Sequence, residues 1–406
     1  MSEKRFTRFR MAWRSLSFRI AVRYIVFLFA LALLSPIIAT RQPLLVKDGD
    51  GFHFPALTEW GRGNVGLQDF KNWDDNPDAF VIHALIPYSP GESDLLNSGY
   101  KGPFDEQLTR QSNGTLTGLP IRNWHWLGTD LRGTDVLSGI LYGARISLAI
   151  GLLSSICGAL VGLFLGGISG WLSVTGWYIR RGKFWSTVIV LPFILHILLM
   201  NHLPGGNFFW RGLMVLLLFL VGYGMSKMVE SISFFNKTFR LSIDPFITRI
   251  TELFSTFPKI LIVLVFAGFL KPSWLNVVIL LTLTGWADMA RLVRTEILRV
   301  SSFNYLDAAR LSGAGTFRIL WKHVLPNAVP ALAVMFVFSI ALNILIESSL
   351  SFLGLGVPPG TVTWGTLLAS GKEQVSAWWL VLFPGLVLSC SIAALQHIAE
   401  GLQIKR

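Results

Sequence analysis

Residues 147–168 read SLAIGLLSSICGALVGLFLGGI, a run without a single charged side chain. An α-helix needs about 20 predominantly apolar residues to span the hydrocarbon core of a bilayer, and this run has that length. Further apolar windows that approach it lie at residues 20–39, 213–223, 260–270 and 329–346. Because soluble folds rarely contain even two such windows, the sequence predicts a protein that crosses a membrane several times.

The composition supports the same class. Of the 406 residues, 52% are hydrophobic and 14% are charged, and the mean hydropathy of +0.55 is too apolar for an ordinary soluble enzyme. Residues 41–135 hold 8 Lys and Arg against 13 Asp and Glu, a net charge of −5. Because the whole chain has a net charge of +12, the remaining residues carry a net charge of +17. Because this positive charge lies beside the apolar segments, it is typical of membrane orientation and argues against nucleic-acid binding.

The cysteines and the N-terminus add two expectations. Cys157 and Cys390 both lie inside apolar runs, so no disulfide framework or cysteine metal site is expected in the polar segment. The basic N-terminus precedes the apolar run 20–39, which has membrane-spanning length and no evident small-residue cleavage site. This pattern predicts a retained signal anchor.

Eight membrane-spanning helices are predicted, and the basic residues orient them. Basic side chains flank the spans at both termini and at residues 180–183, 227–249 and 291–322. With eight crossings all of these positions fall on one side, which the positive-inside rule identifies as cytoplasmic, and the acidic segment 41–135 falls outside. The predicted spans are residues 20–39, 143–170, 185–202, 208–228, 248–270, 274–294, 329–350 and 378–400.

Glycine recurs at every fourth residue in the second predicted span. This spacing places the glycines on one helix face, where another helix can pack closely. Static close packing is the simpler interpretation, and a seam along which two helices slide is the alternative. The stripe consists of Gly158, Gly162, Gly166 and Gly170.

Residues 296–327 form an amphipathic segment between two predicted spans. Gly313 and Gly315 are expected to divide it into two short helices that end before Pro326. Its apolar face could fit a groove on a partner protein or lie on the lipid surface, and the composition alone does not separate these alternatives.

The run YLDAARLSGAGTFRILWKHVLPNAVP, residues 305–330, resembles the coupling-loop signature of permeases of ATP-binding-cassette (ABC) importers. That signature reads E-A-A, three residues, Gly, nine residues, Ile, one residue, Leu-Pro. Asp307 stands in place of the glutamate and His323 in place of the isoleucine. The matching positions of this chain are Asp307, Ala308, Ala309, Gly313, Leu325 and Pro326.

Three further stretches resemble the second permease subunit of dipeptide, oligopeptide and nickel importers. HWLGTDLRGTDVLSGILYGARISL, residues 125–148, is similar to that family's segment leading into its second helix. ESSLSFLGLGVPPGTVTWGTLLASG, residues 347–371, resembles its external loop, and WWLVLFPGLVLSCSIAAL, residues 378–395, its last helix. The resemblance therefore covers most of the chain.

The resemblance implies an all-α, polytopic transmembrane helix bundle of the ABC importer permease type, with six family helices and an inserted pair. Residues 1–40 would be a cytoplasmic N-terminus and first helix, and residues 41–140 an enlarged extracytoplasmic loop. Residues 141–406 would form the permease domain, with an inserted helical hairpin at about 174–243 and a cytoplasmic coupling loop at 296–327. The two unmatched blocks are most of the outer loop and the inserted pair.

The resemblance also implies a function and a set of partners. The chain would form half of the transmembrane path for a peptide-like substrate in a bacterial inner membrane, with both termini cytoplasmic. It would pair with a homologous permease, two ATPase subunits and an extracytoplasmic substrate-binding protein, and need no cofactor because the ATPase subunits bind ATP. Residues 307–313 would dock into a cleft of the ATPase. Whether the substrate is a peptide, nickel or another solute stays open, with a peptide preferred.

The residues give little sign of catalysis or of metal binding. No phosphate-binding loop occurs, since Gly371-Lys372 is followed by Glu373 and lacks the upstream glycine, and no enzyme activity is expected. Ser169, within a G-x-S-G pattern, could act with His196 or His397 in an intramembrane serine protease, which is an alternative of another class. An ion-gradient-driven secondary transporter and a structural scaffold are further alternatives, although we find no convincing internal repeat.

Three acidic residues within or near the predicted spans call for an explanation, because charge in lipid is costly and usually faces protein or water. They are Glu252, Asp288 and Glu347. Asp288 lies near Arg291 and Arg294, so a helix-end ion pair is predicted. Glu347 could line the outer mouth of a channel or bind nearby backbone groups, and neither residue is assigned to substrate binding.

Overall fold

The computed structural model describes most of the chain. The described residues are 13, 15–48, 51–56, 80–110, 115–180, 208–230, 238–241, 244–304, 309 and 311–403, with isolated residues between 186 and 194. They divide into two compact units, which we describe separately. The larger unit comprises Met1–Phe164, Thr251–Val293 and Asn327–Arg406, and the smaller one Leu165–Ile250 and Arg294–Pro326.

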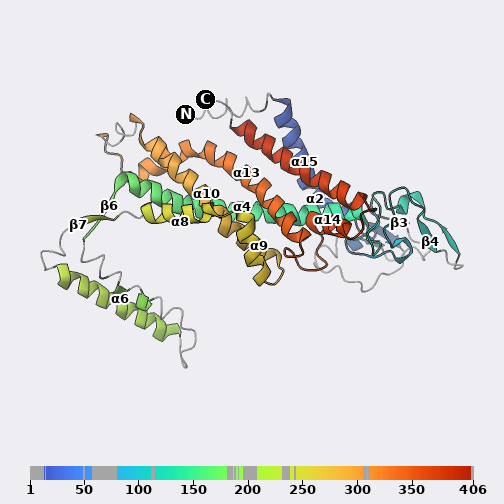
Figure 1. Ribbon diagram of the computed structural model, residues 1–406, viewed down its shortest axis with the longest axis horizontal. Helices are drawn as coiled ribbons and strands as arrows, with labels where there is room; N and C mark the ends of the chain where they lie inside the picture. Colours follow the sequence, from blue (N-terminus) through green and yellow to red (C-terminus); the bar gives the residue numbers. More distant parts are fainter. Residues whose placement is uncertain are drawn as a thin grey trace. The chain divides into compact units, whose positions relative to one another are not determined.

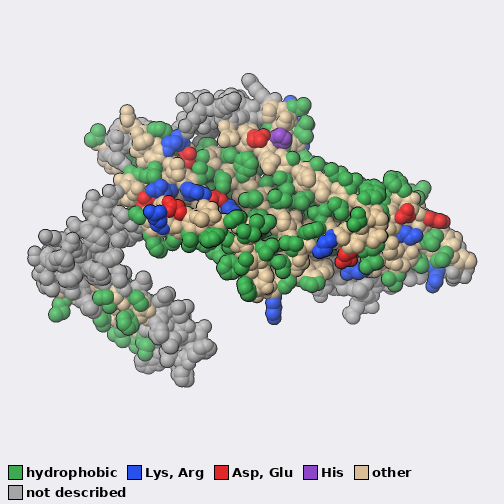
Figure 2. Space-filling view, viewed as in Figure 1, with side chains coloured by type: hydrophobic (Ala, Val, Ile, Leu, Met, Phe, Trp, Pro, Cys, Tyr) green, Lys and Arg blue, Asp and Glu red, His purple; other side chains and the backbone are tan. Residues whose placement is uncertain are grey.

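Helices dominate the larger unit, as Figure 1 shows. In the view of Figure 2, hydrophobic side chains cover the surface over α9 and few charged side chains interrupt them, which suits contact with lipid. The helices that contribute to this unit are α2 (Leu16–Ile38), α4 (Val136–Thr175), α8 (Asp244–Thr256), α9 (Lys259–Phe269), α10 (Trp274–Ser301), α13 (Leu325–Phe352), α14 (Trp364–Lys372) and α15 (Trp379–Leu402).

Five of these helices are long and apolar enough to cross a membrane, and the bent pair α8 and α9 makes a sixth candidate, counted over the described residues. They correspond to the six family helices of the predicted bundle. Of the predicted inserted pair, residues 208–228 lie within α6 (Phe208–Glu230), whose apolar part is the shorter stretch Leu213–Gly224. The other predicted helix, 185–202, lies almost wholly outside the described residues.

The core of the larger unit forms where α2, α4, α13, α14 and α15 meet, and α2 packs along α15 (Figure 1). Trp364, at the start of α14, is fully buried there, and its indole Nε1 donates a hydrogen bond to the Ile140 carbonyl of α4 at 3.2 Å. Thr363 and Thr366 form a capping box that starts α14. This short helix lies in a stretch that the sequence predicts to be a loop.

The predicted span 248–270 is two helices rather than one. α8 and α9 are bent by 83° at the residues between them. Pro258 precedes α9 with φ −58° and ψ 123°, outside the helical region. Proline lacks an N–H, and it also disfavours the helical conformation of the residue before it, so a helix ends here. The bend directs Lys259, the first residue of α9, back toward α10.

The glycine stripe of α4 packs against α10. A Cβ added at Gly162 would lie 2.6 Å from the Met289 Cβ and 2.8 Å from the Trp286 carbonyl oxygen, closer than real Cβ atoms approach. At Gly158 the nearest atom would be 3.7 Å away, an ordinary contact. In the smaller unit a Cβ at Gly170 would lie 3.1 Å from the Ile297 Cβ, and Gly166 is buried.

The polar segment before α4 contains small antiparallel sheets. One sheet has the strand order β2-β1-β3, with β1 (Leu45–Asp48) between β2 (Gly51–His53) and β3 (Phe80–Ile82). A hairpin of β4 (Leu108–Arg110) and β5 (Leu116–Gly118) follows. The segment is joined to the helices where the Trp379 indole of α15 donates a hydrogen bond to the Thr129 carbonyl at 3.1 Å.

A buried histidine organises the end of this polar segment. The His125 ring is fully buried and lies 3.0 Å from Asp135 through Nδ1 and 3.4 Å from Asp94 through Nε2, with the Tyr88 ring stacked on it at 4.0 Å. Burial alone would lower the pKa of His125, but the hydrogen bonds and charges of Asp135 and Asp94 outweigh it and raise the pKa. Burial would raise the pKa of Asp94, yet the hydrogen bonds from His125 and Asn97 lower it.

The smaller unit contains the end of α4, the start of α8 and the end of α10. A two-stranded antiparallel ribbon of β6 (Trp177–Arg180) and β7 (Thr238–Leu241) brackets the inserted block that contains α6. The ribbon pairs Trp177 with Leu241 and Arg180 with Thr238, so the two ends of the insertion lie together. An insertion with adjacent ends can be accommodated without separating the helices that it interrupts.

Candidate functional site

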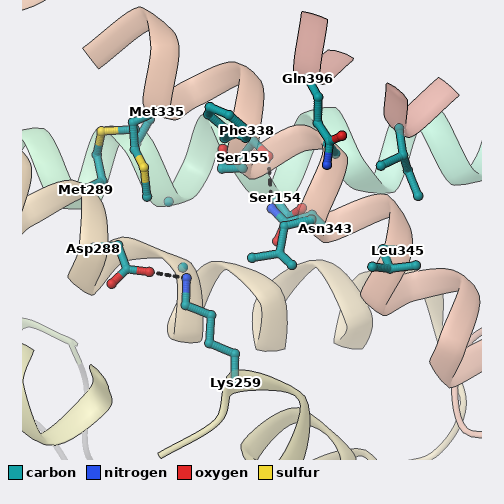
Figure 3. A pocket seen from close by; sticks show the side chains of 17 residues that line it. Ser154, Ser155, Lys259, Asp288, Met289, Met335, Phe338, Asn343, Leu345 and Gln396 are labelled. Carbon is teal, nitrogen blue, oxygen red and sulfur yellow. Dashed lines mark hydrogen bonds and ion pairs between the residues drawn. The ribbon is translucent and has the colours of Figure 1, made fainter. Parts of the chain in front are cut away.

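A cavity of about 250 Å³ lies among α4, α9, α10, α13 and α15 of the larger unit (Figure 3); its wall is mostly apolar, and we call it the polar cavity after the few polar groups that it contains. Its uncharged polar groups come from three helices that are distant in sequence: Ser155 of α4, Asn343 of α13 and Gln396 of α15. The Asn343 Nδ2 donates a hydrogen bond to the Ser155 Oγ at 2.9 Å. Polar side chains inside a membrane protein face other protein groups or a water-filled cavity, which makes this cavity a candidate site.

An ion pair closes one side of the cavity. The Lys259 ammonium of α9 binds the Asp288 carboxylate of α10, in the lower part of Figure 3. Arg291, one turn further along α10, donates from Nη2 to the other oxygen of Asp288 at 2.6 Å. The predicted pair between Asp288 and Arg291 is present. Arg294, the other predicted partner, binds a different acid, and Lys259 is a partner that the sequence did not indicate.

The segment between α10 and α13 turns at Gly313, which has φ +77°. The Ala314 N–H donates to the Ala309 carbonyl at 3.1 Å, the six-residue closure of a Schellman motif with Gly313 in the left-handed position. Any residue with a Cβ is strained in that conformation. Two of the predicted coupling residues, Asp307 and Ala308, lie outside the described residues.

The same segment exposes large apolar side chains. Leu311 is 90% exposed, Phe317 72% and Trp321 58% in this chain. Phe317 belongs to α12 (Thr316–Ile319), and Trp321 to a π-helical turn, Leu320–Val324, that leads directly into α13. Because Leu325 and Pro326 begin α13 itself, a displacement of this segment can pass along one continuous helical path.

Comparison with known proteins assigns the family. Residues 233–403 match the family described as binding-protein-dependent transport system inner membrane component. A putative peptide transport system permease protein of Brucella suis is 30% identical over 280 residues, which cover 69% of this chain and 72% of the relative. The chain belongs to this family of inner-membrane permeases.

Two other relatives cover different shares of the permease. The dipeptide transport system permease protein DppC of Bacillus subtilis is 29% identical over 306 residues, 74% of each chain. The inner membrane ABC transporter permease protein YejE of Escherichia coli is 27% identical over 387 residues, 93% of this chain and 89% of the relative. The chain is therefore a multi-pass inner-membrane subunit of an ABC importer, a class that works with ATPase and substrate-binding partners.

In the smaller unit of the permease, a partly buried network joins three helices. The Arg294 guanidinium of α10 binds both carboxylate oxygens of Asp244, with Nη2 at 2.7 Å from Oδ2. Ser169 of α4 donates its hydroxyl hydrogen to the Asp244 Oδ1 at 2.5 Å. Since Asp244 begins α8, this bidentate pair joins the start of α8 to the last two turns of α10, the helix that leads to the residues around Gly313.

The remaining candidates of the sequence have structural surroundings. Glu347 is fully buried and accepts hydrogen bonds from Ser351 at 2.8 Å and Ser348 at 3.3 Å, both on its own helix, and Glu252 is exposed on α8. Ser169 is fully buried, so a protein substrate has no access to its hydroxyl. His196 lies outside the described residues, and His397 pairs with Glu400 of α15.

Sequence reasoning missed the polar cavity and the Asp244–Arg294 pair. One signal was present: Lys259 directly follows Pro258 and opens an otherwise apolar run, and an isolated charge at such a place indicates a partner. The residues that meet Lys259 at the cavity could not be predicted, because Asp288 and Asn343 come from helices whose packing the sequence does not specify. Among the described residues no group of three or more potential metal ligands occurs.

Proposed function

We propose that this permease imports a peptide-like substrate and is driven by ATP hydrolysis in separate partner subunits. The relatives support a peptide substrate, since the Brucella suis and Bacillus subtilis proteins are described as permeases of peptide and dipeptide transport systems. In this proposal ATP is bound by the partners, and the permease carries no cofactor of its own.

One observation supports mechanical coupling above the others. Leu311, at 90% exposed, stands beside the Gly313 turn, on a segment connecting two membrane-spanning helices. Exposed apolar side chains on a short helical segment fit a groove on a partner. The predicted coupling loop is 296–327, and α10 extends to Ser301. We propose that the rest of this loop, residues 302–327, which we call the coupling segment, docks into the ATPase subunit, so that its movement on nucleotide binding is transmitted to α10 and α13.

The proposal includes an orientation and a set of partners. Both termini and the coupling segment face the cytoplasm, and the polar segment of about residues 41–135 faces the exterior, where a substrate-binding protein delivers the substrate. A second, homologous permease completes the transmembrane path, and two ATPase subunits bind on the cytoplasmic side. The charge difference between the two sets of loops supports this arrangement.

The complete importer in lipid vesicles tests the coupling. We expect Gly313→Trp to reduce ATP-driven uptake of a dipeptide by about tenfold or more, because it strains a left-handed residue by roughly 1–2 kcal/mol and adds bulk to the docking surface. Leu311→Asp should also reduce uptake, since a charge would enter the apolar contact. Both variants should still hydrolyse ATP through the partner subunits, without matching transport.

Leu95 offers a matched control, because it is 80% exposed but lies in the polar segment before α4. Leu95→Asp should leave uptake within about twofold of the original, as surface substitutions usually do. Unchanged uptake by Gly313→Trp would remove the coupling proposal. Uptake that needs an ion gradient and no ATP would favour the secondary transporter instead.

A further inference from the structure

The polar cavity has hydrogen-bonding groups that the protein itself does not use. The Asn343 Nδ2 is occupied by Ser155, but within the described part of the chain the Asn343 Oδ1 accepts no hydrogen bond. The Gln396 amide likewise makes no hydrogen bond to any described residue. An amide oxygen and an amide group facing one cavity can bind the N–H and C=O groups of a ligand.

On the charged side of the cavity, two cations contact one carboxylate. Asp288 carries one negative charge and is bound by two cations, Lys259 and Arg291. Arg291 is half exposed and does not line the cavity, whereas the Lys259 side chain is 22% exposed and does. Lys259 can therefore bind a second anion while Arg291 continues to neutralise Asp288.

We propose that this cavity binds a short peptide, with its free C-terminal carboxylate at Lys259 and its amide groups at Asn343 and Gln396. The inference rests on the proposed peptide import and adds the place where the permease contacts the peptide. Figure 3 shows the arrangement, with the Lys259–Asp288 pair in the lower part and the Asn343 and Gln396 amides above it.

Size and lining limit the ligand further. The cavity of about 250 Å³ lies below the roughly 300–1,000 Å³ of pockets for drug-sized ligands, so one or two peptide residues fit. Met289, Met335 and Phe338 form its apolar lining. Methionine is flexible and polarisable and adapts to different shapes, so these walls accept varied peptide side chains while the carboxylate and amides fix the backbone.

Photolabelling tests the site directly. A dipeptide of alanine and photoleucine, which carries a small diazirine, is imported by the complete importer in vesicles and activated with light. We expect the label on Met289, Met335 or Phe338, mapped by mass spectrometry. Lys259→Met should reduce this labelling and the maximal uptake rate about tenfold, as expected for one lost charge-assisted hydrogen bond, whereas Lys259→Arg should retain both.

A double variant separates peptide binding from a structural ion pair. If Lys259 served only to neutralise Asp288, then Lys259→Met combined with Asp288→Asn would restore uptake. We expect no restoration, because the peptide carboxylate still lacks its cation. Restored uptake would overturn the inference.

Three further outcomes of these experiments would count against the inference. Dissociation of the two permeases by Lys259→Met in size-exclusion chromatography would overturn the inference, because the cavity would then be part of the contact with the second permease. Import of the dipeptide with labels only elsewhere would overturn this inference and leave the proposed function standing. No import of any peptide by the unmodified importer would overturn both.

Discussion

The coupling segment and the polar cavity differ in how they are built. The coupling segment is continuous in sequence, turns at Gly313 and exposes Leu311 and Trp321. The cavity is assembled from Ser155, Lys259 and other residues on five helices that are spread along the sequence. The proposed contact with the ATPase would thus be encoded locally, whereas the proposed contact with a peptide would depend on how the helices pack.

This difference predicts different sensitivities to substitution. The cavity should fail when helix packing fails, even if no lining residue is altered. The coupling segment should fail when its local turn or its anchoring to the helix ends fails, while the cavity remains intact. The following experiments test this contrast.

The largest effect is expected for Gly162→Leu, which acts on the cavity through helix packing. Even the Cβ would approach the Met289 Cβ to 2.6 Å, and Met289 lines the cavity. Overpacking of this kind costs about 1–3 kcal/mol and sometimes more, so we expect little folded protein after detergent extraction. The measurement is the yield and thermal unfolding of the purified permease.

Gly158→Ala is the matched control on the same helix face. Its added methyl group would lie 3.7 Å from the nearest atom of α10, so stability should change by less than about 1 kcal/mol. If both variants behaved alike, the close α4–α10 packing would not determine the cavity, and the contrast would be lost.

A smaller effect is expected for Asp244→Asn, which acts on the side of the coupling segment. The change removes the charge that binds Arg294 and Ser169, and we expect a local destabilisation of about 1–3 kcal/mol, since the pair is only partly buried. The measurements are hydrogen exchange at the start of α8, which should become faster, and peptide uptake, which should fall.

Glu296→Gln provides the comparison for Asp244→Asn. Glu296 also binds an arginine, but Arg299 lies three residues away on the same helix. Such a pair contributes only about 0.2–0.5 kcal/mol, so exchange and uptake should stay near their original values. Equal effects of the two variants would contradict an anchoring role for the pair between helices.

The smallest effect is expected in the polar segment before α4, which is part of neither the coupling segment nor the cavity. The raised pKa of His125 means that its stabilising contribution is complete below the usual value of 6.5 and is lost as the pH rises through the folded-state pKa. The lowered pKa of Asp94 means that its contribution is present above the usual value of 3.8 and is lost as the pH falls through the folded-state pKa. Stability should therefore be greatest between these limits.

His125→Gln should remove the loss on the alkaline side, at a cost of about 1–2 kcal/mol to the segment at neutral pH. Hydrogen exchange of residues 115–135, corrected for the intrinsic pH dependence of exchange, measures both the alkaline loss of stability and the cost at neutral pH. A segment whose alkaline pH dependence is the same with and without His125 would contradict this assignment.

Much of the fold follows from local sequence. Uncharged runs such as 147–168 predict membrane helices because each backbone N–H and C=O must be satisfied inside lipid, and α4 contains that run. The bend before α9 has a local cause in Pro258, but a proline alone does not determine the bend angle. The prediction of one continuous helix over residues 248–270 was wrong, because the chain forms two helices there. The helix α14 was missed because it is only 9 residues long and contains no long apolar run, although its capping-box residues Thr363 and Thr366 are present in the sequence.

By itself, the sequence determined the membrane class, the long apolar helices, the glycine face of α4 and the turn at Gly313, because hydrophobic run length and glycine conformation act over a few neighbouring residues. Only the tertiary structure decided which charges meet. Lys259 and Asp288, or Asp244 and Arg294, are separated by tens of residues, and their pairing depends on side-chain packing between helices, which no local pattern specifies.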